Sequence, residues 1–456
     1  MCSSRPRTTL PRQLSGLVRA GARRGSQYPG GVPRPALSPE QLAVFERIEH
    51  TREHVFVTGR AGTGKSTILN HLAYETSKII AVCAPTGVAA LNVGGQTIHS
   101  LLRLPTGVIA DHELEQPAEL KKMLAAIDTL VIDEISMVSA DLMDAIDRSL
   151  RQARGKKHDP FGGAQIIMFG DPYQLPPVPP RDPHERAYFE DTYRSLWFFD
   201  ARVWRDSPMT VIELTEVHRQ RDDRFKQILT AVRHGEVTAD QAEELNAAGA
   251  RPAPDDVITL ATTNATVARI NADRLARITG EPLRAVAEIN GEFRENTYPA
   301  DEVLQLKPGA QVMFLRNDPD GRWVNGTIGT VSRISGTVWV EVGDEEFEVE
   351  PTVWERHRYR YDAETKKLEK EVVAEFEQFP LRLAWAVTVH KSQGHSYDAA
   401  VIDLGPRAFS AGQSYVALSR IRSLEGLYLR RPLQPRDVIV DPNVARFMHD
   451  ALGRST

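Results

Sequence analysis

The sequence predicts an α/β protein with two parallel-sheet domains, the second of which is interrupted by a small antiparallel β unit. Nearly continuous apolar runs, such as Val55–Val57, alternate with helical patterns, as in parallel sheets that are covered on both faces. A glycine-rich segment, GRAGTGKS (Gly59–Ser66), joins one such run to the start of a helix. Residues 317–380 instead alternate apolar and polar side chains, which favours antiparallel strands.

The first domain is expected to span residues 37–209. Its strands are apolar runs separated by helical patterns or long connections: Val55–Val57, Ile79–Ala84, Thr129–Asp133 and Gln165–Gly170. Residues 103–123, between the second and third strands, are rich in turn formers and acids. We therefore expect a small surface insertion there.

The second domain is expected in two parts, residues 210–316 and 381–440, on either side of the β unit. Its strands are predicted at Val211–Leu214, Val257–Ala261, Val401–Leu404 and Gly426–Leu429, and its helices at Arg224–His234 and Ala265–Ile278. Within residues 317–380, turns separate short strands at Thr327–Ser332, Thr337–Val342 and Glu346–Glu350. Residues 441–456 are expected to form a C-terminal tail.

Composition narrows the class of protein. Charged residues make up 26% of the chain, close to the ~25% of ordinary globular proteins. The net charge of -5 gives no broadly basic surface, although a local groove rather than the total charge decides nucleic-acid binding. The two cysteines, Cys2 and Cys83, argue against a disulfide framework, a zinc site or an iron–sulfur cluster. No run of ~18 apolar residues occurs, so we expect no membrane association.

Residues 1–36 are expected to form a disordered basic tail, because this stretch holds seven arginines and no acidic residue. Three interpretations stay open: an electrostatic tether to nucleic acid, an organellar transit peptide and a dispensable tail. We expect the protein in the cytoplasm, associated with the nucleoid. Mitochondrial targeting by the arginine-rich stretch is the minor alternative.

The GRAGTGKS segment has the composition of a loop that binds the phosphates of ATP. Its small residues let backbone N–H groups close on phosphate oxygens, and the helix N-terminus adds a favourable dipole. Lys65 can reach the β- and γ-phosphates, and the Ser66 hydroxyl can bind Mg²⁺. The residues expected to hold the nucleotide are Gly59, Gly62, Thr63, Gly64, Lys65, Ser66 and Thr67.

Two further segments supply candidate catalytic groups. VIDE (Val131–Glu134) places two carboxylates at the end of a strand, where Asp133 would hold Mg²⁺ and Glu134 would activate water. In GDPYQLPPV (Gly170–Val178), Gln174 would lie at the sheet edge and sense the γ-phosphate.

Arg219 and Arg420 are candidates for neutralising charge in the transition state, because a planar guanidinium does this well. Spacing alone does not select them among the many arginines of the chain. If both reach the phosphates from the second domain, ATP lies between the domains and its hydrolysis is coupled to their closure.

In their order, these segments resemble the motifs of the Pif family of DNA helicases, with RecD-type helicases as relatives. The matching segments are LSPEQ (37–41), GRAGTGKS, APTGVAAL (84–91), GGQTIHSL (94–101), VIDEIS, GDPYQLPPV, LTEVHRQRDDRFKQILTAVRHGEV (214–237), TVHKSQGHSYD (388–398) and QSYVALSRIRS (413–423). The most discriminating piece, EISMVSADLMDAIDRSLR (Glu134–Arg151), is similar to a helix characteristic of this family. Read from its residues alone, it is an amphipathic helix capped by Ser139.

The resemblance covers about residues 40–430 and implies two RecA-like domains with ATP between them. It also implies 5′-to-3′ translocation on single-stranded DNA, activity at DNA forks, and a small Src-homology-3-like β-barrel inserted in the second domain. We expect a monomer. The roles it implies are adenine recognition for Gln41, γ-phosphate contact for Gln174, Arg219 and Arg420, and a place on or near the DNA path for Thr86, His99, His390, Lys391 and Ser392.

The sequence departs from the family pattern in two motifs. In GDPYQLPPV, Pro172 and Tyr173 stand where an aromatic residue is more usual at the first of these positions. Gly394 is followed by His395 and Ser396, where a threonine usually comes soon after the glycine. Two alternative functions stay open, an RNA helicase of the same superfamily and a nucleotide-switched DNA clamp that does not unwind. A metabolic kinase is disfavoured because no second substrate pocket is predicted.

Overall fold

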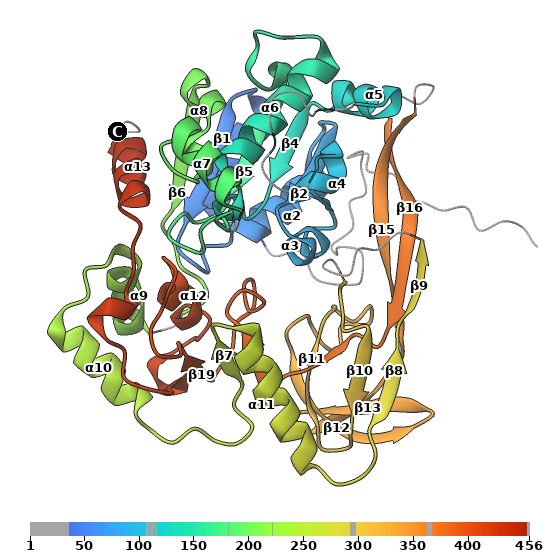
Figure 1. The fold of residues 1–456 in the computed structure, drawn as a ribbon, viewed down its shortest axis with the longest axis vertical. Helices are drawn as coiled ribbons and strands as arrows, with labels where there is room; N and C mark the ends of the chain where they lie inside the picture. Colours follow the sequence, from blue (N-terminus) through green and yellow to red (C-terminus); the bar gives the residue numbers. More distant parts are fainter. Residues whose placement is uncertain are drawn as a thin grey trace, which may run out of the picture.

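The computed structural model describes residues 36–105, 109, 114, 116–180, 182–220, 222–291, 298–362 and 367–453. The expected basic tail, residues 1–36, lies outside this part of the chain except for its last residue. Among the described residues, no helix combines the length and the apolar character needed to cross a bilayer. Figure 1 shows the first domain above the second, with the β-rich insert beside them.

Six parallel strands form the sheet of the first domain, in the order β3-β2-β4-β5-β1-β6. They are β1 His54–Gly59, β2 Ile80–Ala84, β3 Gln96–Thr97, β4 Thr129–Ile132, β5 Gln165–Phe169 and β6 Met209–Leu214. All of their pairings are parallel. The four strands predicted for this domain are confirmed.

The assignment of Val211–Leu214 to the second domain is wrong. These residues belong to β6, which pairs with β1 from His54 opposite Met209 to Gly59 opposite Leu214. This pairing satisfies the backbone groups on the outer edge of β1 and buries Leu214 in the first domain. An apolar run does not show by itself which sheet it joins, so the boundary expected at residue 209 falls inside the first sheet.

Helices cover both faces of this sheet. Alternate residues of β1 separate the two sides, since Val55 and Val57 face one core and Phe56 faces the other. The helices are α1 Pro39–His50 and α2 Lys65–Glu75 on the first side, and α4 Ile98–Leu102, α5 Ala118–Ala126, α6 Ala140–Arg154, α7 Pro183–Thr192 and α8 Arg202–Asp206 on the second.

The expected surface insertion at residues 103–123 is wrong for its last part. Helix α5 begins at Ala118 and packs against α6. Leu120, Met123 and Leu124 are buried there, because their spacing puts them on one helical face. Most of residues 106–115 lie outside the described part of the chain.

Helix α6, the predicted amphipathic helix, also buries three acidic residues, Asp141, Asp144 and Asp147. Ser139 is its N-cap as predicted, but the hydroxyl bonds to the carboxylate of Asp141 rather than to the backbone. Asp144 accepts from the Tyr193 hydroxyl at 2.9 Å. Asp147 accepts from the backbone N–H of Phe161 at 2.6 Å. These carboxylates hold the surrounding loops on the helix.

The second domain contains a smaller parallel sheet of four strands, in the order β18-β7-β19-β20. The strands are β7 Thr259–Ala261, β18 Ala386–Thr388, β19 Ala400–Asp403 and β20 Leu427–Leu429. The accompanying helices are α9 Asp223–His234, α10 Ala239–Gly249, α11 Asn264–Arg277 and α12 Gln413–Leu418. The predicted helices and three predicted strands are confirmed here, while β18 was not predicted.

The three antiparallel strands expected in the inserted unit are confirmed as β12 Ile328–Ser335, β13 Thr337–Val342 and β14 Glu345–Val349. They belong to a five-stranded sheet in the order β14-β13-β12-β11-β17, with β11 Gln311–Phe314 and β17 Leu381–Leu383. The expected bounds, residues 317–380, are therefore too narrow, because β11 and β17 pair not in the sheet of the second domain but in this sheet. A further pair, β8 (Leu283–Val286) and β10 (Val303–Leu306), precedes it. Closure into a Src-homology-3-like barrel stays a prediction.

A long hairpin within the insert was not predicted. It consists of β15 (Thr352–Asp362) and β16 (Lys367–Gln378), and β16 also pairs with β9 (Glu288–Gly291). The hairpin reaches the first domain, where it contacts α4 and α5 (Figure 1). Charged residues dominate its sequence, so the apolar alternation that identified the other strands is weak.

The expected C-terminal tail is wrong, because Pro442–Gly453 form helix α13. The chain returns here to the first domain, as Figure 1 shows. The Phe447 ring stacks on Phe199 at 4.1 Å between centroids, and the Trp197 indole N–H donates to Asp441 at 2.7 Å. The aromatic contacts partly bury the Phe447 side chain and thereby stabilise α13 against the first domain.

Candidate active site between the two domains

The GRAGTGKS loop joins β1 to α2 in a conformation that depends on glycine. Gly64 is the N-cap of α2 and has a left-handed backbone, with φ of 81°. Gly62 also has a positive φ, and a Cβ there would lie 2.4 Å from the Cβ of Arg219. Because Gly62 has no side chain, Arg219 can lie close to the backbone of the loop.

Lys65 points back over the loop. Its ammonium group donates to the carbonyls of Gly59 at 2.7 Å and Arg60 at 3.2 Å. Loss of hydration lowers the pKa of Lys65, and Asp171 and Glu134 act in the opposite direction. Ser66, the next residue, is exposed. A cation and a hydroxyl thus lie at the start of α2, where phosphate and Mg²⁺ are expected.

Gln41 contacts the same loop from α1. Its side chain forms a capping box with Ser38, and its amide donates to the Thr63 carbonyl at 3.2 Å. Thr63 is buried, and its hydroxyl donates to the Arg60 carbonyl at 3.0 Å. Thr67 lies one turn into α2, and its N–H donates to the Gly64 carbonyl. The recognition of adenine by Gln41 stays a prediction.

Asp133 and Glu134 follow β4, and both carboxylates interact electrostatically with Lys65 of the phosphate loop. Burial, and next the neighbouring Glu134, raise the pKa of Asp133 to about 7. Burial also raises the pKa of Glu134, whereas Lys65 and Arg420 lower it. Glu134 has a left-handed backbone with φ of 49°, which is uncommon for a residue other than glycine. Two adjacent, poorly hydrated carboxylates form a site that favours a divalent cation.

Gln174 follows β5 and is 6% exposed. Its backbone N–H donates to the Asp171 carbonyl at 2.9 Å, which fixes the turn that carries its side chain.

The two arginine candidates meet at one backbone segment. Arg219 donates to the Ser419 carbonyl at 3.4 Å, and Gln220 donates to the same carbonyl at 3.1 Å. Arg420 donates to the Val416 carbonyl at 3.0 Å and to the Ser419 hydroxyl at 2.9 Å. Burial, and next Arg420, lower the pKa of Arg219 to about 9. The structure thus brings both arginines to the side of the loop and of Glu134.

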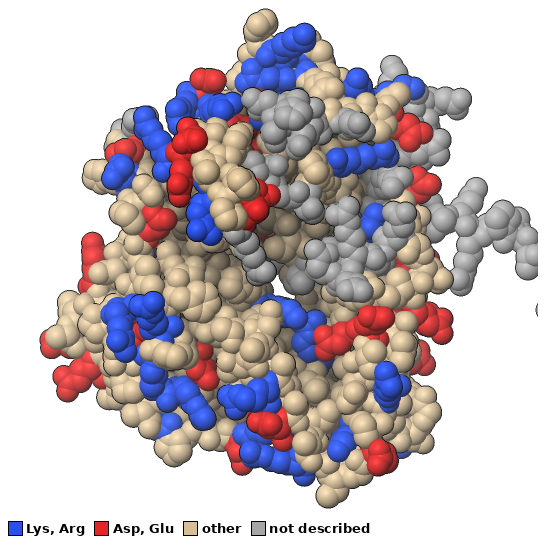
Figure 2. Space-filling view, viewed as in Figure 1, with Lys and Arg blue, Asp and Glu red and all other residues tan. Residues whose placement is uncertain are grey.

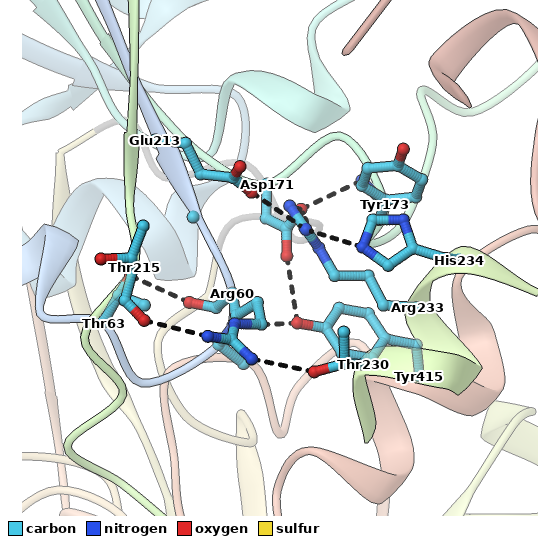
Figure 3. A network of polar contacts seen from close by, with 12 residues as sticks. Arg60, Thr63, Asp171, Tyr173, Glu213, Thr215, Thr230, Arg233, His234 and Tyr415 are labelled. Carbon is cyan, nitrogen blue, oxygen red and sulfur yellow. Dashed lines mark hydrogen bonds and ion pairs between the residues drawn. The ribbon is translucent and has the colours of Figure 1, made fainter. Parts of the chain in front are cut away.

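Sequence analysis missed a buried polar network that joins the two domains (Figure 3). Asp171 of the first domain pairs with Arg233 of α9 at 3.0 Å, and Arg233 also pairs with Glu213 of β6 at 3.0 Å. The Tyr415 hydroxyl donates to Asp171 at 3.2 Å and accepts from the N–H of Ala61 at 2.9 Å. Asp171 and Tyr415 lie inside the quoted motifs, but their pairing across the domains has no signal in the sequence.

The five residues predicted to contact DNA lie on three different elements and differ in their exposure to solvent. The Thr86 hydroxyl accepts from the Ala89 N–H at 3.2 Å at the start of α3 (Gly87–Asn92), and His99 is half-buried on α4. His390 and Lys391 are exposed after β18. Ser392 is fully buried, and its hydroxyl donates to the Val389 carbonyl at 2.7 Å. In this conformation, Ser392 shapes the turn rather than facing a ligand.

Lys391 borders a groove of about 580 Å³ that lies between α11 and the insert, beside Asn264, Gln305 and Arg382. It also borders a smaller cavity of about 50 Å³ that includes Asn92 of the first domain. Figure 2 shows a small group of lysine and arginine side chains beside a hollow between the two halves of this face, with acidic side chains next to them. The basic group offers a local contact for the phosphate backbone of a nucleic acid.

Comparison with known proteins identifies the same helicase family as the sequence motifs. The sequence profile of PIF1-like helicases matches residues 36–243. The ATP-dependent DNA helicase Pif1 of Bdellovibrio bacteriovorus is 36% identical over 90% of this chain and 91% of its own length. The chain belongs to the PIF1-like helicase family. Relatives in this family differ in length, and the chain spans 63% of the rat ATP-dependent DNA helicase PIF1, to which it is 37% identical.

Solved Pif1 structures show the same fold. Bacteroides Pif1 in complex with ADP-AlF4 has a TM-score of 0.85 at 35% identity, covering 92% of this chain and 98% of that one. Bacteroides Pif1 bound to single-stranded DNA has a TM-score of 0.68 at the same identity and the same coverage of both chains. The two RecA-like domains of the Pif1 fold are thus confirmed. The structure here is more similar to the Bacteroides structures without DNA, since unliganded Bacteroides Pif1 also has a high TM-score, 0.82.

Proposed function

We propose that this chain is an ATP-dependent DNA helicase that moves 5′ to 3′ along single-stranded DNA and separates the strands of a duplex. The observation that carries the proposal is that two arginines of the second domain reach groups of the first: Arg219 lies against Gly62 of the phosphate loop, and Arg420 acts electrostatically on Glu134. A nucleotide held there touches both domains, so its hydrolysis alters their relative position. Family membership supports DNA as the polymer on which this motion acts.

In the proposed reaction, Lys65 and the N–H groups at the start of α2 hold the phosphates. Glu134 takes a proton from the attacking water, which its raised pKa favours near neutral pH. Arg219 and Arg420 neutralise charge that develops on the γ-phosphate, and Gln174 senses its presence. Gln41 recognises adenine beside the loop.

We propose Mg²⁺ as the metal, with Ser66 and Asp133 as its protein ligands. Supporting this assignment, Ser66 lies at the start of α2 and Asp133 at the end of β4, and their hydroxyl and carboxylate oxygens are the kind of ligand that Mg²⁺ prefers. Burial raises the pKa of Asp133 to about 7, so a bound cation would favour its ionised form. The described residues contain no group of three or more metal-ligating side chains. This agrees with Mg²⁺, which keeps waters and substrate phosphates among its ligands.

The proposed DNA contacts connect to the nucleotide site through the backbone. The segment after Lys391 runs beside the segment that carries Arg420, since the Tyr397 N–H donates to the Arg420 carbonyl at 2.8 Å and the Arg422 N–H donates to the Tyr397 carbonyl at 3.2 Å. Movement of Arg420 toward a nucleotide therefore displaces the loop of His390 and Lys391. We propose Thr86 and His99 as contacts from the first domain.

The test is ATP-dependent strand separation on matched duplexes with a 5′ or a 3′ single-stranded tail. Unwinding of the 5′-tailed duplex alone supports the proposal, and unwinding of the 3′-tailed duplex alone overturns its direction. ATP hydrolysis stimulated by DNA without unwinding favours the clamp, and stimulation by RNA but not DNA favours the RNA helicase. We further propose that the active unit is a monomer at single strands and forks, acting on nucleoid DNA in the cytoplasm.

A further inference from the structure

Tyr415 lies on α12 of the second domain, but both hydrogen bonds of its hydroxyl go to the first domain. The hydroxyl accepts from the Ala61 N–H in the phosphate loop at 2.9 Å and donates to Asp171 at 3.2 Å. The side chain is 3% exposed. Burial, and next Asp171, raise the pKa of Tyr415, so the hydroxyl keeps the proton that it donates.

Asp171 is itself held in place by other groups. It accepts from Arg233 Nη2 at 3.0 Å and from Arg233 Nε at 3.3 Å, and from the Tyr173 N–H at 3.2 Å. The Arg233 guanidinium also lies 4.4 Å from the centroid of the Tyr173 ring. Asp171 thus gives Tyr415 a fixed acceptor rather than a mobile surface carboxylate (Figure 3).

The chain from Tyr415 to Arg420 is one hydrogen-bonded turn. The Ser419 N–H donates to the Tyr415 carbonyl at 2.9 Å, and the Arg420 N–H donates to the Ala417 carbonyl at 3.2 Å. The Arg420 guanidinium reaches back to the Val416 carbonyl at 3.0 Å. Because these bonds tie the turn together, a shift of Tyr415 relative to the phosphate loop shifts Arg420 as well.

We propose that Tyr415 is a positioning residue that sets the approach of Arg420 to the nucleotide, by holding α12 against the phosphate loop and Asp171. This proposal rests on the role of Arg420 in hydrolysis proposed above. Tyr415 acts through Arg420, so its loss slows the chemical step more than it weakens ATP binding.

The first experiment compares two tyrosine-to-phenylalanine variants in DNA-stimulated ATP hydrolysis. Tyr415→Phe keeps the ring and removes the hydroxyl, and we expect kcat to fall about ten- to hundredfold with KM for ATP changed by less than roughly threefold. Tyr193→Phe is the matched control, because Tyr193 is also buried and its hydroxyl also donates to a buried carboxylate, that of Asp144 on α6 at 2.9 Å, outside the nucleotide cleft. We expect this control to stay within about twofold of wild type.

The second experiment separates positioning from general stabilisation by a double-mutant cycle. Arg420→Lys keeps a charge, so hydrolysis stays measurable, but it removes the planar fork. If Tyr415 acts through Arg420, Tyr415→Phe costs far less in the Arg420→Lys background than in wild type. Thermal melting of all four proteins sets an assay temperature at which each is folded.

Two results overturn the proposal: a Tyr415→Phe rate within twofold of wild type, or an equal loss in both backgrounds. A failure of the proposed function looks different. In that case, wild type shows no DNA-stimulated hydrolysis, or Arg420→Lys hydrolyses ATP as fast as wild type.

Discussion

The nucleotide cleft and the predicted DNA-facing residues are built in different ways. In the cleft, Asp171, Arg233 and Arg420 are almost completely buried and bond to groups from other segments of the chain. On the DNA side, His390 and Lys391 are exposed to solvent. A buried charge needs its partner in the folded protein, whereas an exposed lysine can stay hydrated until a phosphate arrives. The cleft is therefore preformed, and single substitutions in it should have larger effects than substitutions on the DNA side.

The largest effect is expected for Arg420→Ala. Loss of its positive charge should lower kcat for DNA-stimulated ATP hydrolysis by about 10³- to 10⁵-fold, as for other arginines that stabilise phosphoryl transfer. Steady-state hydrolysis at saturating ATP and DNA measures this loss. Arg422→Ala is the matched control, because Arg422 is two residues away but exposed, where it pairs with Asp398. Equal rates for the two variants would remove Arg420 from the site.

Glu134→Gln should come next, with a loss of about 10²- to 10⁴-fold in hydrolysis, because the amide cannot accept a proton from water. Fluorescent nucleotide binding should stay near wild type, since the amide keeps the shape of the side chain. The exposed Glu119 provides a control as Glu119→Gln, for which we expect no change in either assay. Substantial turnover by Glu134→Gln would contradict its role as the base.

Asp133→Asn should separate function from stability within the cleft. The folded-state pKa of Asp133 is raised to about 7, above its ordinary value, so the folded protein holds a proton that the unfolded chain has already lost. Its stability therefore falls as pH rises through about 4 to 7, and ionised Asp133 is a cost above that range. Asn removes this cost.

Without nucleotide, Asp133→Asn should raise the free energy of unfolding at pH 8 by about 1–3 kcal/mol and by much less at pH 5, while hydrolysis is lost. Guanidinium unfolding at both pH values measures the difference, and Asp206→Asn at an exposed position is the control. A stability gain that is independent of pH would argue against the raised pKa as its cause.

The smallest effect is expected for Lys391→Ala on the DNA side. Affinity for single-stranded DNA should fall a few-fold for every sequence, and the slope of log affinity against log salt should decrease by about 1. Fluorescence anisotropy with labelled oligonucleotides over a range of salt measures both. Lys157→Ala, at an exposed lysine after α6, should leave the slope unchanged. A loss for Lys391→Ala as large as that for Arg420→Ala would break the contrast between the two regions.

Short-range patterns in the sequence predicted the elements that position the phosphate loop. The loop glycines, the strand before them and the helix after them are neighbours in the chain, so their chemistry is local. Burial on both faces makes β1, β2, β4 and β5 mostly apolar, which is why they were found from sequence. The charged hairpin β15–β16 was missed because its apolar alternation is weak. Helix α13 was missed because its partner, Phe199, lies in the first domain, far away along the chain.

The sequence by itself determined the phosphate loop, the pair Asp133–Glu134 and membership of a motor family, because each depends on residue types at fixed short spacing. Only the tertiary structure decided that β6 completes the first sheet, that Asp171 is shared by Arg233 and Tyr415, and that Ser392 faces inward. These outcomes depend on which strand edges and buried charged groups come into contact, although they lie far apart along the chain. Sequence spacing does not encode that choice, because each of these groups has many possible partners until the two domains pack together.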